Sequence, residues 1–177
     1  MEWKLDDAWQ KARHRVVRLG PEPDMESLVA EWSACVARVQ AVFAAHYGPV
    51  AVTTRFELPD DYATFMCKYG GNWRWQDGLV QDLFSAADVA IVTARDFEAF
   101  VTARQEVDEP QDDGLWLSIA HYSDKHDILL CCDRLHRYRG RVVDYHDSHP
   151  WLNGAERSSM VLGRSFLGWI HRLGGCT

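Results

Sequence analysis

The sequence has few cysteines, and their spacing is not that of a metal knuckle or a disulfide framework. The five cysteines include no Cys-x-x-Cys pair, and an odd number without a regular spacing argues against both structures. Cys131 and Cys132 are adjacent, so on a strand they would face opposite sides. We therefore expect reduced thiols in the core, a cytoplasmic location, and neither a metal nor a cofactor.

Targeting and catalytic motifs are also missing. The N-terminal stretch MEWKLDDAWQKARHRVV has no apolar h-region, so a secretory signal is not expected. No uncharged apolar run approaches the ~18 residues of a membrane span. A Gly-x-Ser-x-Gly elbow, a glycine-rich phosphate loop and the zinc deaminase pattern are absent. These absences favour a protein that is neither an enzyme nor bound to a membrane.

Basic residues are outnumbered, 19 against 26 acidic ones, and the formal net charge is −7. This balance argues against a nucleic-acid binder, which needs Lys and Arg to neutralise phosphates, but it suits a basic protein partner. The acidic run EVDEPQDD at residues 106–113 is either a solvated loop or a docking element. The basic segment RLHRYRGR at 134–141 is more simply a solvated turn than an RNA contact.

What is present suffices for a core without a metal or a disulfide. A chain of 177 residues buries roughly 70% of its unfolded surface, and its 47% hydrophobic content is that of a soluble globular protein. Apolar residues at helical spacing, with capping and breaking residues at the ends, predict several helices. We expect them from Asp6 or Asp7 to about Arg18, from Asp24 to about His46, from Pro59 to Gly70 or Gly71, from near Thr93 onward, and from Ser159 to Leu173.

Alternating β-branched and aromatic residues predict the strands. Val50–Phe56 is expected to be one, and Asn72–Phe84 a short hairpin. Leu115–His121, Asp127–Asp133 and Arg141–His146 are joined by short links, which favours an antiparallel meander. The predicted class is α+β, with a mainly antiparallel sheet of about five or six strands packed by helices and an added N-terminal helical pair.

A group of His and Asp residues could form a site in this meander. With symmetric hairpins, His121 lies opposite Asp127, Asp127 lies opposite His146, and Asp144 shares their face. The group would suit zinc, iron or manganese in a metal-assisted hydrolase, or a His/Asp acid–base pair. We favour a polar sheet rim held by His–Asp hydrogen bonds, because a one-residue slip sends alternate side chains to the other face.

Four pieces of the chain occur in an order that resembles a known family. They are LPDDYATF continuing to YGG at 58–71, the strands SIA at 118–120 and DILL at 127–130, the stretch GRVVDYHD at 140–147, and SFLGWI at 165–170. This set resembles the SUKH superfamily, which includes fungal cell-wall regulators of the Smi/Knr type and bacterial immunity proteins. The likeness covers residues 50–173, within what we expect to be a single domain.

The resemblance implies a binding protein that neutralises a cognate toxin, often a nuclease or deaminase, or a regulatory scaffold in cell-envelope assembly. Aromatic residues ringed by polar ones commonly anchor interfaces. The expected partner-binding residues are Asp124, Asp147, His149 and Trp151, with Glu109, Asp112 and Asp113 as an acidic flank.

Residues 1–48 lie outside the best match and are expected to form a helical extension. Removal of Met1–Pro23 should leave a folded protein if the second helix belongs to the core and the first does not.

Overall fold

A computed structural model describes residues 2–76, 82–106, 114–123, 126–146 and 161–175. In this part of the chain, six helices accompany a seven-stranded antiparallel sheet, so the α+β class is confirmed, with seven strands rather than five or six. The helices are α1 (Glu2–Arg13), α2 (Met25–Tyr47), α3 (Pro49–Arg55), α4 (Asp60–Tyr69), α5 (Ala86–Glu106) and α6 (Phe166–Leu173). The strands are β1 (Val16–Arg18), β2 (Trp73–Trp75), β3 (Asp82–Leu83), β4 (Trp116–Ser123), β5 (His126–Cys131), β6 (Val142–His146) and β7 (Val161–Gly163).

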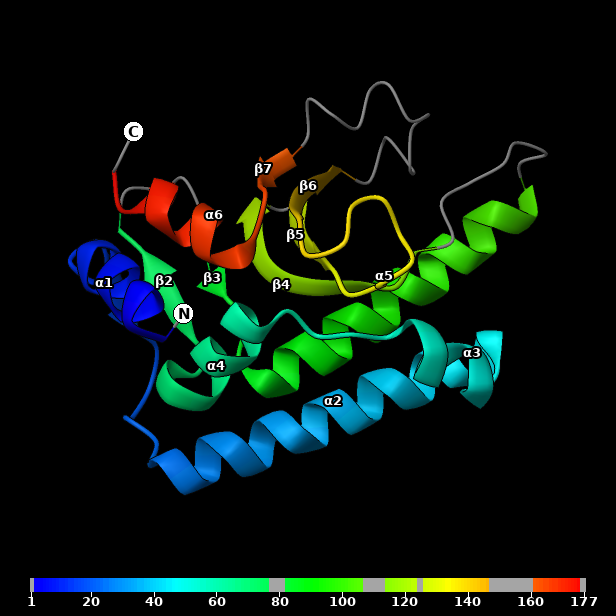
Figure 1. The fold of residues 1–177 in the computed structure, drawn as a ribbon, viewed down its shortest axis with the longest axis horizontal. Helices are drawn as coiled ribbons and strands as arrows, with labels where there is room; N and C mark the ends of the chain where they lie inside the picture. The colour runs from blue at the N-terminus through cyan, green and yellow to red at the C-terminus, as the bar shows by residue number, and fades with distance from the viewer. Residues whose placement is uncertain (1, 77–81, 107–113, 124–125, 147–160, 176–177) are drawn as a thin grey trace.

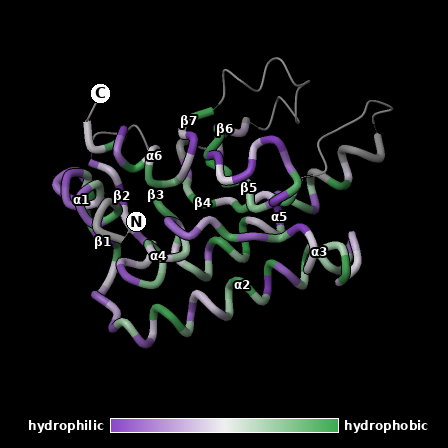
Figure 2. The backbone as a smooth tube through the Cα atoms, in the orientation of Figure 1, coloured by the Kyte–Doolittle hydropathy of each residue, from purple (hydrophilic) through white to green (hydrophobic). Residues whose placement is uncertain are grey.

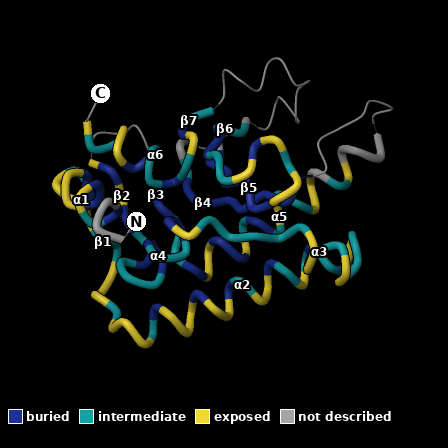
Figure 3. The backbone as a smooth tube through the Cα atoms, viewed as in Figure 1, coloured by how far each residue is buried: buried dark blue, intermediate teal, exposed yellow. Residues whose placement is uncertain are grey.

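The strands follow one another across the sheet in chain order, β1 to β7 (Figure 1). The expected meander of β4, β5 and β6 is confirmed, and so is the short hairpin of β2 and β3. The two long central strands are the most apolar and most buried part of the sheet (Figures 2 and 3).

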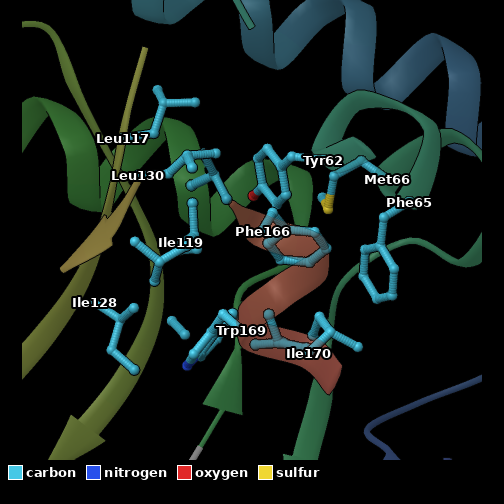
Figure 4. Close-up of a cluster of buried hydrophobic side chains, with 14 of the residues drawn as sticks. Tyr62, Phe65, Met66, Leu117, Ile119, Ile128, Leu130, Phe166, Trp169 and Ile170 are labelled. Atoms are coloured by element: carbon cyan, nitrogen blue, oxygen red, sulfur yellow. The ribbon is translucent and has the colours of Figure 1, made fainter. Parts of the chain in front are cut away.

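Helices α4 and α6 cover one face of the sheet. The rings of Tyr62 and Phe65 of α4 contact that of Phe166 of α6 at steep angles, with centroids 4.8 and 5.0 Å apart. Figure 4 shows these rings facing the aliphatic side chains of the central strands. The residues in that cluster are Tyr62, Phe65, Met66, Leu117, Ile119, Ile128, Leu130, Phe166, Trp169 and Ile170.

One carboxylate joins the starts of α4 and α6. Asp61 Oδ2 accepts a hydrogen bond from the backbone N–H of Leu167 at 2.8 Å, while Oδ1 accepts from the N–H of Tyr62 at 2.9 Å. Ser165 caps α6 through a bond from the Gly168 N–H at 3.0 Å. The pieces LPDDY and SFLGW, which lie about a hundred residues apart in the sequence, therefore meet in the core.

Helix α5 lies against β4 on the other face, with α2 packed beside it (Figure 1). The two helices run in the same direction, since Cys35 lies near Ala90 and the ring of Phe43 lies 5.1 Å from that of Phe97. The expected bounds of α2 are confirmed, and Asp24 caps it through the N–H of Ser27 at 2.8 Å.

By length and composition α2 could also cross a membrane. Core helices pass the same test, and α2 buries Leu28, Trp32, Cys35, Val39 and Phe43 against the rest of the protein.

The N-terminal segment is built into the fold. Leu5, Trp9 and Ala12 of α1 are almost fully buried, and the Trp9 ring contacts those of Phe65 and Trp73 at 4.8 and 5.1 Å. Strand β1 extends the sheet by pairing with β2. The expected N-terminal helices are therefore present, and the first of them belongs to the core.

Four expected elements were wrong in type or bounds. The first helix ends at Arg13, and Val16 lies in β1. Residues 50–55 form helix α3 instead of a strand. Helix α5 begins at Ala86, seven residues before Thr93, and its first turn is held by the Ser85 hydroxyl, which accepts from the Asp88 N–H at 3.2 Å. The last helix begins at Phe166, and strand β7 precedes it.

Candidate functional site

The β4–β5 hairpin brings two of the four expected site residues together. His121 and Asp127 are paired in register, as predicted. The His121 Nδ1 atom lies 2.6 Å from Asp127 Oδ1, and the Asp127 side chain is 6% exposed against 28% for His121. An ionised carboxylate only accepts, so Nδ1 carries the proton and Nε2 is left for another partner.

The predicted register of β6 against β5, which would bring the other two residues to this site, is wrong by one residue. Asp127 pairs with Tyr145 instead of His146, which pairs with His126, and Asp144 pairs with Ile128. Because neighbouring strand positions face opposite sides, Asp144 lies on the face away from Asp127. No group of three or more metal-ligating residues occurs among the residues that the structure describes. The four-residue metal site is therefore not assembled.

The one-residue difference between the expected and the observed pairing of β5 with β6 has a physical cause in the connection between the two strands. Cys131 and Arg141 are joined by a backbone hydrogen bond at 3.0 Å, and the Gly140 N–H returns to the Cys131 carbonyl at 2.9 Å. Gly140 adopts a φ of 72°, in the left-handed region that glycine tolerates. The strands therefore start from Leu130↔Val142, one residue away from the symmetric register.

Helix α5 supplies an arginine that connects two carboxylates. The Arg95 Nη2 atom lies 2.8 Å from Asp127 Oδ2 and 2.6 Å from Asp96 Oδ1. Asp96 Oδ2 accepts a 2.5 Å hydrogen bond from the Ser118 hydroxyl. We call His121, Asp127, Arg95, Asp96 and Ser118 the polar seam, since they form a continuous set of bonds between α5 and the sheet.

Burial alters the protonation of one member of the seam. It raises the pKa of Asp96, whereas the Ser118 hydroxyl bond lowers it, and the negative charge of Asp127 raises it again. Two carboxylates share the single guanidinium of Arg95. The seam therefore favours the protonated form of Asp96 more than water does.

The space beside the seam is small. Thr93, Asp96, Trp116, Ser118 and Tyr145 are among the residues that line a cavity of about 20 Å³, which holds roughly one water molecule. The Ser118 hydroxyl is bonded to Asp96, not to His121. The His121–Asp127 bond joins β4 to β5, as expected of a polar sheet rim, and the Arg95–Asp127 and Asp96–Ser118 bonds hold α5 on the sheet.

A second His-containing contact bears on whether Cys131 could act as a nucleophile. Cys131 Sγ lies 3.6 Å from His136 Nδ1, and that nitrogen also accepts from the Tyr138 N–H at 3.1 Å. Burial raises the pKa of Cys131 to about 12, and likewise that of Cys35 to about 12. A nucleophilic cysteine needs a lowered pKa, so these thiols have the environment of core residues.

The expected partner-binding residues all lie outside the described residues. These are Asp124, Asp147, His149, Trp151, Glu109, Asp112 and Asp113.

The sequence did not single out Arg95 or Ser118. In the sequence, the spacing of Thr93 and Asp96 is that of a capping box, which predicts a helix start near Thr93. Instead both lie inside α5, where Thr93 Oγ1 accepts from the Ser118 N–H at 3.0 Å. The available signal in the sequence was a predicted helix that carries Thr93, Arg95 and Asp96 close together. Their contact with Ser118 can be recognised only once the position of α5 against the sheet is known.

A comparison with models of known protein families finds no match, and a comparison with curated proteins finds none either.

Proposed function

We propose that this protein binds and neutralises a cognate bacterial toxin by direct contact, in the manner of a SUKH-type immunity protein in the cytoplasm. The observation that carries the proposal is the contact between α4 and α6, where Asp61 of LPDDY accepts from the start of SFLGW and the Tyr62 ring meets that of Phe166 edge-on. Each of the four pieces that carry the resemblance contributes to one buried cluster in an α+β fold, through residues such as Tyr62, Ile119, Ile128, Val142 and Phe166.

Charge supports a basic partner such as a nuclease. The chain carries a net charge of −7, and complementary fields speed association and select partners. Asp112, Asp113 and Glu109 form the proposed acidic flank, with Asp124, Asp147, His149 and Trp151 as the proposed anchors. In this arrangement the acidic side chains pair with the basic residues by which a nuclease binds phosphate, and so they prevent its substrate from binding.

The test has two parts. Tagged protein is incubated with lysate of its source cell at moderate salt, and the retained proteins are identified by mass spectrometry. The partner is then expressed alone and together with this chain. One stoichiometric partner that is lethal alone and harmless in the co-expression is the expected result. A retained envelope-assembly protein without toxicity would instead support the scaffold function and contradict neutralisation.

Charge variants locate the interface. Asp112→Asn with Asp113→Asn should slow association with that partner and weaken binding by about 0.2–1 kcal/mol for each charge removed. The matched control is Asp7→Asn with Glu26→Gln, which removes the same charge from exposed positions in α1 and α2. An equal effect of both pairs would contradict a localised acidic flank.

A further inference from the structure

A second and much larger concave site lies at the other end of α5. Its volume is about 220 Å³, which exceeds the ~150 Å³ of an engineered cavity that binds benzene. Pro23, Leu28 and Met66 provide apolar walls, and Ala86 closes it at the start of α5. Pro21 on the rim is exposed, so the site opens to solvent. We call it the Arg18 pocket.

The guanidinium of Arg18 lines this pocket and is fixed in place. Its Nη2 donates to the Tyr69 carbonyl at 2.5 Å and its Nη1 to the Gly71 carbonyl at 3.4 Å. The guanidinium also stacks on the Trp73 ring, 4.1 Å from the centroid. These contacts leave part of its five-donor fork free for a ligand.

The charge of Arg18 has only neutral acceptors in these contacts. No carboxylate lies within 4.0 Å of it in the described ranges, where every ion pair involves other residues. Burial lowers the pKa of Arg18, while the more distant Glu22 raises it. A carboxylate gains most binding free energy from a half-buried cation that has free donors and no adjacent anion.

The start of α5 adds to the positive electrostatic potential that Arg18 creates in the pocket. Ser85 and Ala86 line the pocket at the N-terminus of a 21-residue helix, whose dipole favours a negative group there, although Asp88 in its first turn offsets part of that effect. Glu31 lies on the rim and is exposed. A ligand with an anionic end toward Arg18 and a short apolar body toward Leu28 and Met66 therefore matches the walls.

We propose that the Arg18 pocket binds a small carboxylate with a branched aliphatic body, presented either by a free acid or by the C-terminus of a peptide. The carboxylate bonds to the free donors of Arg18, and the aliphatic group packs on Leu28 and Met66. This proposal is independent of toxin binding, because the pocket lies among the described residues and uses none of the proposed partner-binding ones.

The probes are isocaproate and acetyl-glycyl-leucine, each compared with its primary amide. Binding is followed by NMR through the Trp73 indole N–H, which donates to the Gly70 carbonyl at the pocket wall at 3.3 Å. We expect saturable shifts with a dissociation constant on the order of a few millimolar for the free acid, and roughly tenfold weaker binding of the amides. Tighter binding of the peptide indicates a chain terminus as the natural source, and tighter binding of isocaproate indicates a free acid.

Arg18→Met keeps the aliphatic stem and removes the charge, so it should weaken acid binding about tenfold or more. Arg38→Met, an exposed residue of α2, is the matched control and should bind like the native protein. Ala86→Leu fills the pocket without changing charge and should also abolish binding, which keeps the test decisive if Arg18→Met fails to fold. Equal binding of acid and amide, unsaturable shifts, or equal losses in Arg18→Met and Arg38→Met would overturn the proposal.

Discussion

Single carboxylates connect parts of the chain that are far apart in sequence. Asp61 is the clearest case, because it is 9% exposed and accepts bonds from Tyr62 and Leu167. Its neighbour Asp60 is exposed on the first turn of the same helix. The two adjacent residues therefore have different roles, although both look like helix-start acids in the sequence.

Asp61→Ala should lower the free energy of unfolding by about 1–3 kcal/mol, because it leaves the Leu167 N–H without its partner in a part-buried position. Urea denaturation measures the change. Asp60→Ala is the matched control and should cost about 0.5 kcal/mol or less. Equal losses for the two variants would show that Asp61 acts through the helix dipole alone.

Asp96 gives a pH-dependent prediction at the same scale. A carboxyl whose pKa is raised in the folded state stabilises the fold when protonated, and that stability is lost as the pH rises through the folded pKa. Its environment includes Asp127, Arg95 and, beyond Asp127, His121. The Asp96 contribution therefore declines above about pH 4, the ordinary pKa of an aspartate.

Asp96→Asn removes this titration, so the free energy of unfolding of the variant relative to the native protein should rise between pH 4 and pH 7. Urea denaturation at several pH values checks it. Glu98→Gln, an exposed substitution in the middle of α5, serves as a control for general charge effects. A relative stability that falls over this range would mean that the Arg95 and Ser118 bonds outweigh burial.

Elements with a long repeating pattern of apolar residues could be predicted from the sequence. The type and register of short elements depend instead on the residues that surround them in the fold. The stripe of α2 predicted its bounds within a residue, since burial and helix periodicity agree there. Residues 50–55 have β-branched side chains, yet Pro49 suits the first helical turn and Val52 is buried in the core. Similarly, the predicted His121–Asp127 pairing is present although the register shifts between His121 and Ser123, whereas the β6 register depends on the turn at Gly140.

The exit from α4 is constrained by the strand beside it. A methyl group at Gly71 would overlap the carbonyl oxygen of Phe84, which belongs to the backbone following β3. Gly71→Ala should therefore cost about 3 kcal/mol or more, because a backbone group cannot move aside as a side chain can. Gly140→Ala meets no neighbour within 4 Å and should cost only the left-handed strain of about 1–2 kcal/mol. Thermal unfolding of both variants measures the difference.

The molecule as a whole depends on its first 23 residues. Trp9 is fully buried among Phe65, Tyr69 and Trp73, and Arg15 donates to the Leu173 carbonyl at 2.6 Å, which joins the N-terminal segment to α6. Helices α1 and α6 thus lie side by side (Figure 1). The sequence resemblance covers residues 50–173 only, whereas the core also includes this N-terminal segment.

Removal of Met1–Pro23 should abolish cooperative unfolding. Loss of one buried tryptophan costs roughly 3–5 kcal/mol, and the deletion also removes Leu5, Ala12 and the pairing of β1 with β2. Because a native domain is stable by only about 5–15 kcal/mol, these losses together exceed what the remaining core can supply. Near-ultraviolet circular dichroism during heating measures the transition, with Trp9→Ala in the full chain as an intermediate case. A sharp transition in the truncated protein would show that α2 to α6 form an independent unit and that α1 is an accessory helix.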